Sequence, residues 1–139
     1  MKTVLAFGTF DILHPGHISY LTQAKALGDR LTVIVATDAN VKEIKGRAPV
    51  NGQESRRAMV AALSPVDEAM VGFEDDMIKS VEKVKPDIVA LGYDQNAPKG
   101  MEEKFAERGI RAKVVRLAAY RPEEYKSSRI REKIENGRK

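Results

Sequence analysis

The sequence contains no cysteine and only two histidines among its 139 residues. The absence of cysteine excludes disulfide-stapled folds and thiolate catalysis, and it is compatible with the reducing cytoplasm, where we expect the protein to reside. A zinc site of the usual histidine and cysteine ligands is disfavoured too, because two histidines supply too few ligands and their spacing offers no acidic ones.

Long apolar runs are also missing. The N-terminal stretch "MKTVLAFGTF" has one lysine and a short apolar run ending at Gly-Thr, which indicates neither a signal peptide nor a membrane span. Four phenylalanines and four tyrosines do not alternate with basic residues as they do in single-strand nucleic-acid binders. With 42% apolar and 32% charged residues, the composition predicts one globular domain over residues 1–139, with neither nucleic acid nor membrane as a partner.

Positive charge is concentrated at the C-terminal end. The net charge is +4 over the whole chain, whereas residues 108–139 hold eleven Lys/Arg and four Asp/Glu, a balance of +7. This end is either a surface that holds anions or a solvated helix face.

Apolar runs alternate with helical patterns along the chain. Residues 2–8 and 31–37 are apolar and β-branched, as in strands buried on both faces of a sheet. Between them, Ile18, Leu21, Ala24 and Leu27 form one helical stripe that ends at Gly28. Further helices are expected over 53–63 (capped by Asn51), 75–85, 101–109 and 127–137, and further strands over 67–72, 87–92 and 111–118. The sequence predicts an α/β fold, a Rossmann-like doubly wound parallel five-stranded sheet with helices on both faces.

The stretch "GTFDILHPGH", residues 8–17, follows the first strand, where such sheets bind ligands. Gly8 permits a sharp turn, Pro15 suits the first turn of a helix, and Gly16 allows close ligand approach. The helix N-terminus offers free N–H groups and partial positive charge to an anion, and His14 and His17 can add imidazole donors. Two unrelated core or surface histidines are the alternative. The glycine spacing fits neither a Walker loop nor the GxGxxG motif.

These residues resemble the HxGH signature of the nucleotidyltransferase superfamily that contains the cytidylyltransferases. "ESRRAMVAALSPVDE" looks like that family's arginine-bearing helix, with Arg56 on the family position and Arg57 at the surface. "YKSSRIR" is similar to its second signature, ISSTxIR, with departures at Tyr125 and Lys126. Serines there can cap a helix or donate to an anion.

The resemblance implies a nucleotidyl transfer in which donors neutralise phosphate charge, with a divalent cation, Mg²⁺, as cofactor. It implies catalytic roles for His14, His17 and Arg131. It implies nucleotide contacts from Thr9, Phe10, His14, Pro15, Gly16, His17, Ser127 and Ser128. Asp11 either orients the loop, helps to place Mg²⁺, or makes a structural hydrogen bond. Lys42 and Lys45, expected in the loop after the second strand, either reach the β- and γ-phosphates or are solvated.

The whole-chain pattern most resembles the archaeal-type FAD synthases, through "GTFDILHPGH", "IKGRAPV", "RRAMVAALSPVDEA" and "KPDIVALGYDQ". That resemblance implies transfer of AMP from ATP to FMN, with Asp94 and Tyr120 at the base or ribose, in a homodimer. Three alternatives stay open: a cytidylyltransferase acting on glycerol 3-phosphate or a related polyol phosphate, an adenylyltransferase acting on a sugar phosphate, and a non-catalytic nucleotide-sensing or RNA-binding module.

Overall fold

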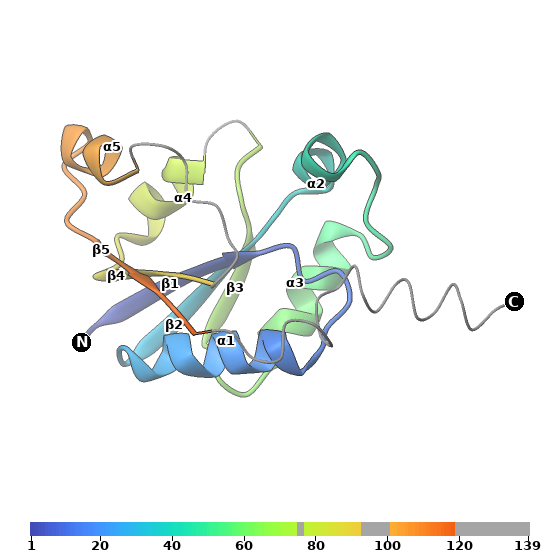
Figure 1. The fold of residues 1–139 in the computed structure, drawn as a ribbon, viewed down its shortest axis with the longest axis horizontal. Helices are drawn as coiled ribbons and strands as arrows, with labels where there is room; N and C mark the ends of the chain where they lie inside the picture. Colours follow the sequence, from blue (N-terminus) through green and yellow to red (C-terminus); the bar gives the residue numbers. More distant parts are fainter. Residues whose placement is uncertain (75–76, 93–100, 119–139) are drawn as a thin grey trace, which may run out of the picture.

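The computed structural model describes residues 1–74, 77–92 and 101–118 of the chain. Its elements are β1 (Thr3–Gly8), α1 (Pro15–Ala26), β2 (Arg30–Val35), α2 (Asp38–Lys45), α3 (Gln53–Ala61), β3 (Glu68–Val71), α4 (Met77–Val84), β4 (Ile88–Leu91), α5 (Met101–Glu107) and β5 (Lys113–Arg116). Their strands pair in parallel, in the order β3-β2-β1-β4-β5 (Figure 1). The predicted terminal helix lies outside the described residues.

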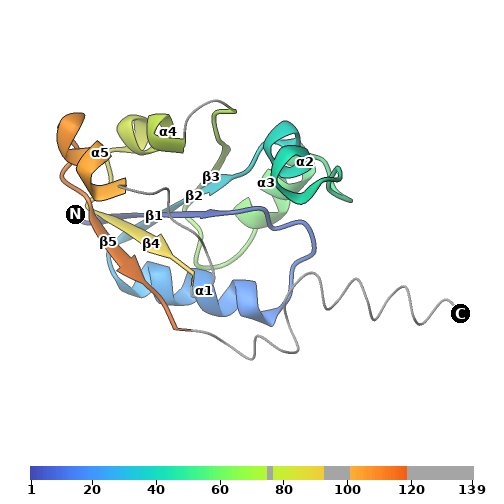
Figure 2. The ribbon, with the colours of Figure 1, turned by 45° about the horizontal axis from the view of Figure 1, so that its top comes forward.

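Both faces of the sheet are covered, as the apolar runs predict. Alternate residues of β1 face opposite ways: Val4 packs with α1 and α3, whereas Leu5 packs with α4 and α5. Figure 2 shows α1 on one side of the sheet and α4 and α5 on the other. A strand that buries both faces must be apolar throughout, and for this reason β1, β2 and β4 are nearly continuous in valine, isoleucine, leucine and alanine. The predicted doubly wound fold is confirmed.

Helix α2 replaces the loop that the sequence predicts around Lys42 and Lys45. The Thr37 hydroxyl caps it by accepting the Asn40 N–H at 3.1 Å, and Gly46 ends it with a φ of 77°. Of its eight residues only Val41 is buried. Its other large apolar residue, Ile44, is 82% exposed, so an eight-residue segment with one buried side chain gave too short a pattern to be predicted as a helix.

One predicted cap is wrong, and another differs in its conformation. Gly52, not Asn51, is the N-cap of α3, because the Asn51 side chain instead donates to the Asp11 carbonyl oxygen at 2.6 Å. Helix α1 ends where the sequence predicts, with Leu27 as C-cap and Gly28 directly after it, but Gly28 does not have the left-handed φ of a capping glycine. A Cβ at Gly28 would lie 2.9 Å from the Lys2 carbonyl oxygen, so this glycine allows close approach to the start of β1. By contrast, Gly109 has the left-handed φ of 71° expected of a glycine that closes a helix.

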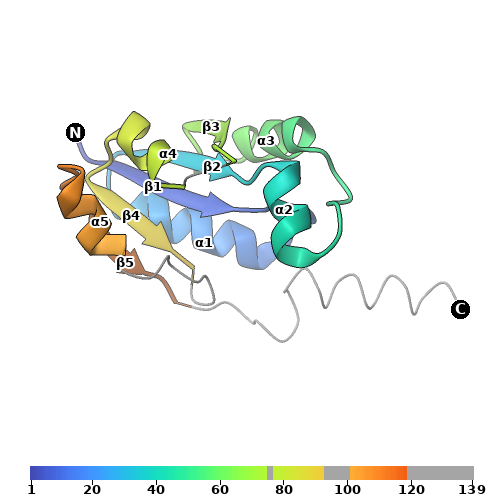
Figure 3. The same cartoon turned by 90° about the horizontal axis from the view of Figure 1, so that it is seen from above.

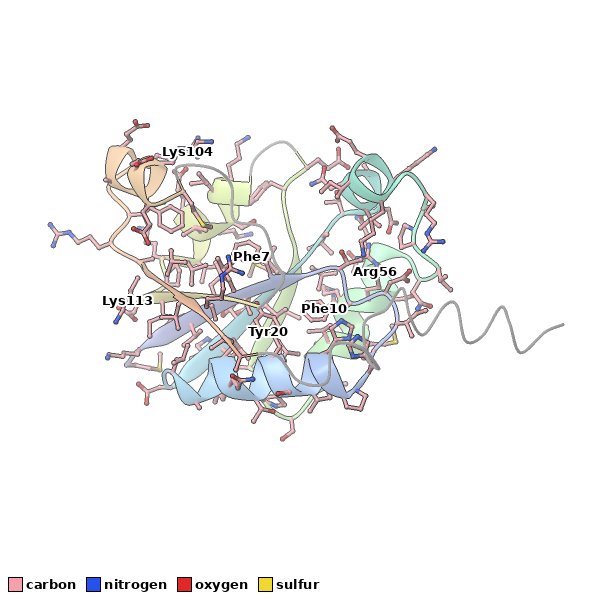
Figure 4. The ribbon with its side chains drawn as sticks, in the orientation of Figure 1. Phe7, Phe10, Tyr20, Arg56, Lys104 and Lys113 are labelled. Atoms are coloured by element: carbon pink, nitrogen blue, oxygen red, sulfur yellow. The ribbon has the colours of Figure 1, made fainter. Side chains whose placement is uncertain are left out.

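The direction of winding reverses between β1 and β4, which places a crevice at the carboxyl ends of these strands. Their last register pair is Ala6 with Ala90. Beyond it, the hydroxyl of the partly buried Tyr20 donates to the Ala90 carbonyl at 2.8 Å and accepts the Phe7 N–H at 3.2 Å, and loss of solvent around the hydroxyl raises the Tyr20 pKa. Figure 4 shows Tyr20 rising from α1 toward β1. Tyr20 thus joins the two strands where their backbones separate.

The N-termini of α1 and α2 follow the carboxyl ends of β1 and β2, and Figure 3 shows α1, α2 and α3 converging at this edge of the sheet. Among the described residues, no helix is long and apolar enough to cross a membrane.

Candidate active site

The first turn of α1 is capped by its own two histidines. His14 is the N-cap residue, and its Nδ1 accepts the Gly16 N–H at 3.1 Å. The Nδ1 of His17 accepts the His14 N–H at 3.3 Å. The two rings stack, with centroids 3.9 Å apart and planes 26° from parallel. The imidazoles therefore form a reciprocal capping box, the arrangement in which serine and glutamate side chains usually serve.

This cap fixes which ring nitrogen of each histidine carries the proton. An Nδ1 that accepts a hydrogen bond is unprotonated, so each neutral imidazole holds its proton on Nε2 and can donate from there. Burial lowers the pKa of His17 to about 3, and the electrostatic influence of His14 and of Lys45 lowers it in the same direction. At neutral pH, His17 is thus an uncharged donor. The pair offers two N–H groups at the positive end of a helix dipole.

The cap also changes the expected role of the helix backbone. The sequence predicts that free N–H groups of the first turn would hold an anion. In the structure, Gly16 donates to His14 Nδ1, and His17 N–H donates to the His14 carbonyl at 2.9 Å. Pro15 has no N–H to offer. An anion at this turn would therefore meet the imidazole Nε2 side of the histidines and the helix dipole rather than these backbone N–H groups.

Phe10 packs against the ring of His17. Its ring is 2% exposed and meets the His17 ring edge to face, with centroids 5.3 Å apart. The backbone of Phe10 is left-handed, with a φ of 53°, which is uncommon for a bulky residue. A Cβ on Gly8 would lie 2.5 Å from the Phe10 ring, so glycine at position 8 makes room for that ring. Any contact of Phe10 with a nucleotide would come from its backbone.

Asp11 holds the loop before α3. Its carboxylate is 3% exposed, and its two oxygens accept the N–H groups of Val50 at 2.9 Å and Asn51 at 2.8 Å. Of the three roles considered for Asp11, the structure shows structural hydrogen bonds, which tie the turn after β1 to the loop before α3.

Arg56 and Arg57 are neighbours on α3 with different surroundings. Arg56 is completely buried, and its guanidinium donates to the Asn51 carbonyl, the Thr9 carbonyl and the Asp38 carboxylate. Arg57 pairs at 3.1 Å with the exposed Glu54. Figure 4 shows Arg56 between α3 and the turn after β1, close to Phe10. The predicted surface position of Arg57 is confirmed.

The structure brings Thr9, Phe10, His14, Pro15, Gly16 and His17 together in one turn. Lys42 and Lys45 are both exposed in the last turn of α2, and Lys45 is close enough to His17 to lower its pKa. Beside His14 lies an open groove lined by Leu13, Pro15, Ile18, Ser19 and Leu63. The other candidates, Asp94, Tyr120, Lys126, Ser127, Ser128 and Arg131, lie outside the described residues.

Asp38, Asn51 and Tyr20 also shape this site, although the sequence analysis did not assign them to it. Their partners lie 18, 40 and 70 residues away along the chain. Local pattern carries no signal of such contacts.

The cytidylyltransferase-like family model matches residues 5–133. A FAD synthase of Ferroglobus placidus is 52% identical over 86% of this chain and 78% of its own length. A FAD synthase of Methanocella paludicola is 48% identical over 96% of both chains.

Solved structures agree with these matches. The crystal structure of a Thermoplasma volcanium protein, described as a lipopolysaccharide core biosynthesis protein, has 45% identity and a TM-score of 0.82 over 86% of this chain and 98% of that one. A pantoate-beta-alanine ligase from Francisella tularensis, 14% identical with a TM-score of 0.61 over 94% of this chain and 67% of that one, shares the fold alone. The paired-histidine turn at the carboxyl end of β1 thus occurs in a chain that belongs to the cytidylyltransferase-like family of nucleotidyltransferases.

Proposed function

We propose that this protein transfers the adenylyl group of ATP to FMN, giving FAD and pyrophosphate. A phosphate oxygen of FMN forms a bond to the α-phosphorus of ATP, and the bond from that phosphorus to the oxygen bridging to the β-phosphate breaks. Pyrophosphate leaves with the electron pair of that bond. The step is one displacement, with no change of oxidation state.

The observation that carries this proposal is the stacked pair of imidazoles at the N-terminus of α1, each with its proton on Nε2. Charge grows on the non-bridging α-phosphate oxygens and on the leaving pyrophosphate as the reaction proceeds. Donors fixed in place before the reaction stabilise such charge at little reorganisation cost. Because the cap and Phe10 hold both rings, His14 and His17 are suited to this role.

The reaction needs no general base from the protein. The second pKa of a phosphate monoester is about 6, so the attacking oxygen of FMN is ionised at neutral pH. The protein must instead bring two anions together in line and offset their repulsion. Neutral imidazole donors, a helix dipole and the nearby Lys45 fit that task better than a proton acceptor would.

The similarity to FAD synthases supports ATP and FMN as the substrates. Within the described residues, no group of three or more histidine and acidic side chains is arranged to hold a metal, and both Asp11 oxygens accept backbone N–H groups. We assign Mg²⁺ to the substrate, as MgATP, because this ion usually keeps waters and phosphate oxygens as ligands.

Several assignments from the sequence remain part of this proposal. Arg131, Ser127 and Ser128 would add donors to the triphosphate, and Asp94 and Tyr120 would contact the base or ribose. The enzyme would act as a homodimer in the cytoplasm. Light scattering at micromolar concentration tests the dimer, and a monomer mass would contradict it.

The test of the reaction is product chromatography with four pairings, ATP or CTP with FMN or glycerol 3-phosphate. Of the four pairings, only ATP with FMN should give FAD, together with an equal amount of pyrophosphate. Turnover of CTP with glycerol 3-phosphate, without any FAD from ATP and FMN, would instead identify a cytidylyltransferase. No pyrophosphate in any pairing would refute nucleotidyl transfer with these substrates.

A further inference from the structure

Arg56 is an arginine that no solvent reaches. Its side chain has 0% exposure, and each of its guanidinium nitrogens donates to an acceptor: Nε to the Asn51 carbonyl at 2.9 Å, and the two terminal nitrogens to the Thr9 carbonyl and to Asp38 Oδ1, both at 2.8 Å. A buried charge is costly unless it is paired and hydrogen-bonded. In this fold, three hydrogen bonds from the guanidinium compensate the burial of its charge.

The three acceptors belong to three different segments. Thr9 follows β1 and opens the turn that leads to His14, Asp38 begins α2, and Asn51 precedes α3. The planar fork of a guanidinium can reach three acceptors in fixed directions, which a lysine ammonium on a flexible stem cannot do with the same geometry.

Asp11 also holds the loop that contains Asn51, through three further hydrogen bonds. The Asp11 carboxylate accepts the N–H groups of Val50 and Asn51, and the Asn51 side chain donates back to the Asp11 carbonyl. The turn between β1 and α1 is thus tied to the 50–51 segment through Asp11 and to Arg56 through Thr9. Asp38 extends the same network to α2, which carries Lys45 near His17.

We infer that Arg56 is a positioning residue for the transfer reaction: it fixes the histidine turn and the start of α2 relative to each other and does not touch the phosphates. This inference rests on the proposed function for its kinetic meaning. An arginine near an anion site would ordinarily be assigned to phosphate binding. The absence of exposed surface on Arg56 and its three internal hydrogen bonds argue against that assignment.

The test compares Arg56→Lys with the matched control Arg57→Lys, one residue away on the same helix. Arg56→Lys keeps the charge but loses the fork, so kcat should fall about tenfold to hundredfold, as small misplacements of reacting groups do. The KM for ATP should stay within about twofold, because no contact with ATP is removed. Arg57→Lys should leave both parameters within about twofold of the unchanged protein.

A second readout is independent of turnover. The imidazole ¹⁵N resonances of His14 and His17, recorded without substrate, should shift in Arg56→Lys and stay in place in Arg57→Lys. If Arg56→Lys does not fold, Asp38→Ala serves instead, because it removes one acceptor at a half-exposed side chain. It should shift the same resonances and lower kcat with little change in KM.

Two results would overturn the inference. A raised KM for ATP with unchanged kcat would make Arg56 a phosphate-binding residue. A lower Tm with unchanged imidazole resonances and unchanged kcat per folded molecule would make it only a structural one. If the unchanged protein makes no FAD, the proposed function fails, and the imidazole resonances still decide whether Arg56 positions the histidines.

Discussion

Replacement of His17 separates its chemical role from its structural role. In His17→Ala, the Nε2 donor is lost, and kcat should fall about 10²–10³-fold, the usual effect of removing one preorganised donor to developing charge. The same change removes the Nδ1 acceptor of the His14 N–H and the edge contact with Phe10. The lost cap and the lost aromatic contact should each cost about 1 kcal/mol, so Tm should fall by about 5–10 °C.

The matched variant His17→Asn divides these effects. Asparagine carries its carbonyl oxygen on Cγ, where histidine carries Nδ1, so it can still accept the His14 N–H. It places no donor where Nε2 lies. Its Tm should therefore lie closer to that of the unchanged protein than the Tm of His17→Ala does, while its kcat should be as low.

The assay is initial-rate formation of FAD at saturating ATP and FMN, with Tm measured on the same preparations by circular dichroism. Near-normal kcat in His17→Ala would refute the assignment of Nε2 as the donor. Recovery of kcat in His17→Asn would show that the cap, and not the donor, is what the reaction requires.

Three further changes test the surroundings of this site. The pKa of His17 is about 3 in the folded protein and 6.5 in the unfolded chain, so the unfolded chain takes up the proton first as the pH falls. The contribution of His17 to the stability of the folded protein is therefore present above pH 6.5 and is lost as the pH falls toward 3. Urea unfolding from pH 7 to pH 4 should show this loss of stability. If the free energy of unfolding falls equally steeply with pH in His17→Asn, the loss comes from groups other than His17. Gly8→Ala sets a Cβ 2.5 Å from the Phe10 ring, so it should shift the turn and lower kcat; unchanged kcat and imidazole resonances would contradict this. Lys45→Met removes one of the charges that lower the His17 pKa, so NMR titration should give a higher pKa, and an equal or lower value would show that Lys45 does not act on His17.

The sheet could be predicted from the sequence because burial on both faces leaves a strong local signal. Strands β1, β2 and β4 are runs of apolar residues with few interruptions, and α1 shows Leu21 and Ala24 on its inner face. Helix α2 could not be predicted in this way, since it buries only Val41. Its signals, the Thr37 cap and Gly46, are short and are common in turns as well.

The candidate site, like the fold, could be predicted from the sequence only in part. The position of "HPGH" after a buried strand predicts an anion-binding turn, because that place is set by topology. The reciprocal cap, and with it the proton on Nε2, depends on the rotamers of His14 and His17, which spacing does not determine. Arg56 illustrates the same limit: it is one of two adjacent arginines, and only the fold decides that Arg56 is buried against Thr9 while Arg57 pairs with Glu54.

The most direct test of the account follows the phosphorus atom that is transferred. The protein is incubated with FMN and ATP labelled with ³²P at the α-phosphate, in parallel with ATP labelled at the γ-phosphate, and the products are separated by chromatography. The account predicts that α-label appears in FAD and γ-label in pyrophosphate, and that both rates fall together in His17→Ala. Release of α-label as AMP or ADP with no labelled FAD, or labelled FAD formed at the same rate by His17→Ala, would contradict it.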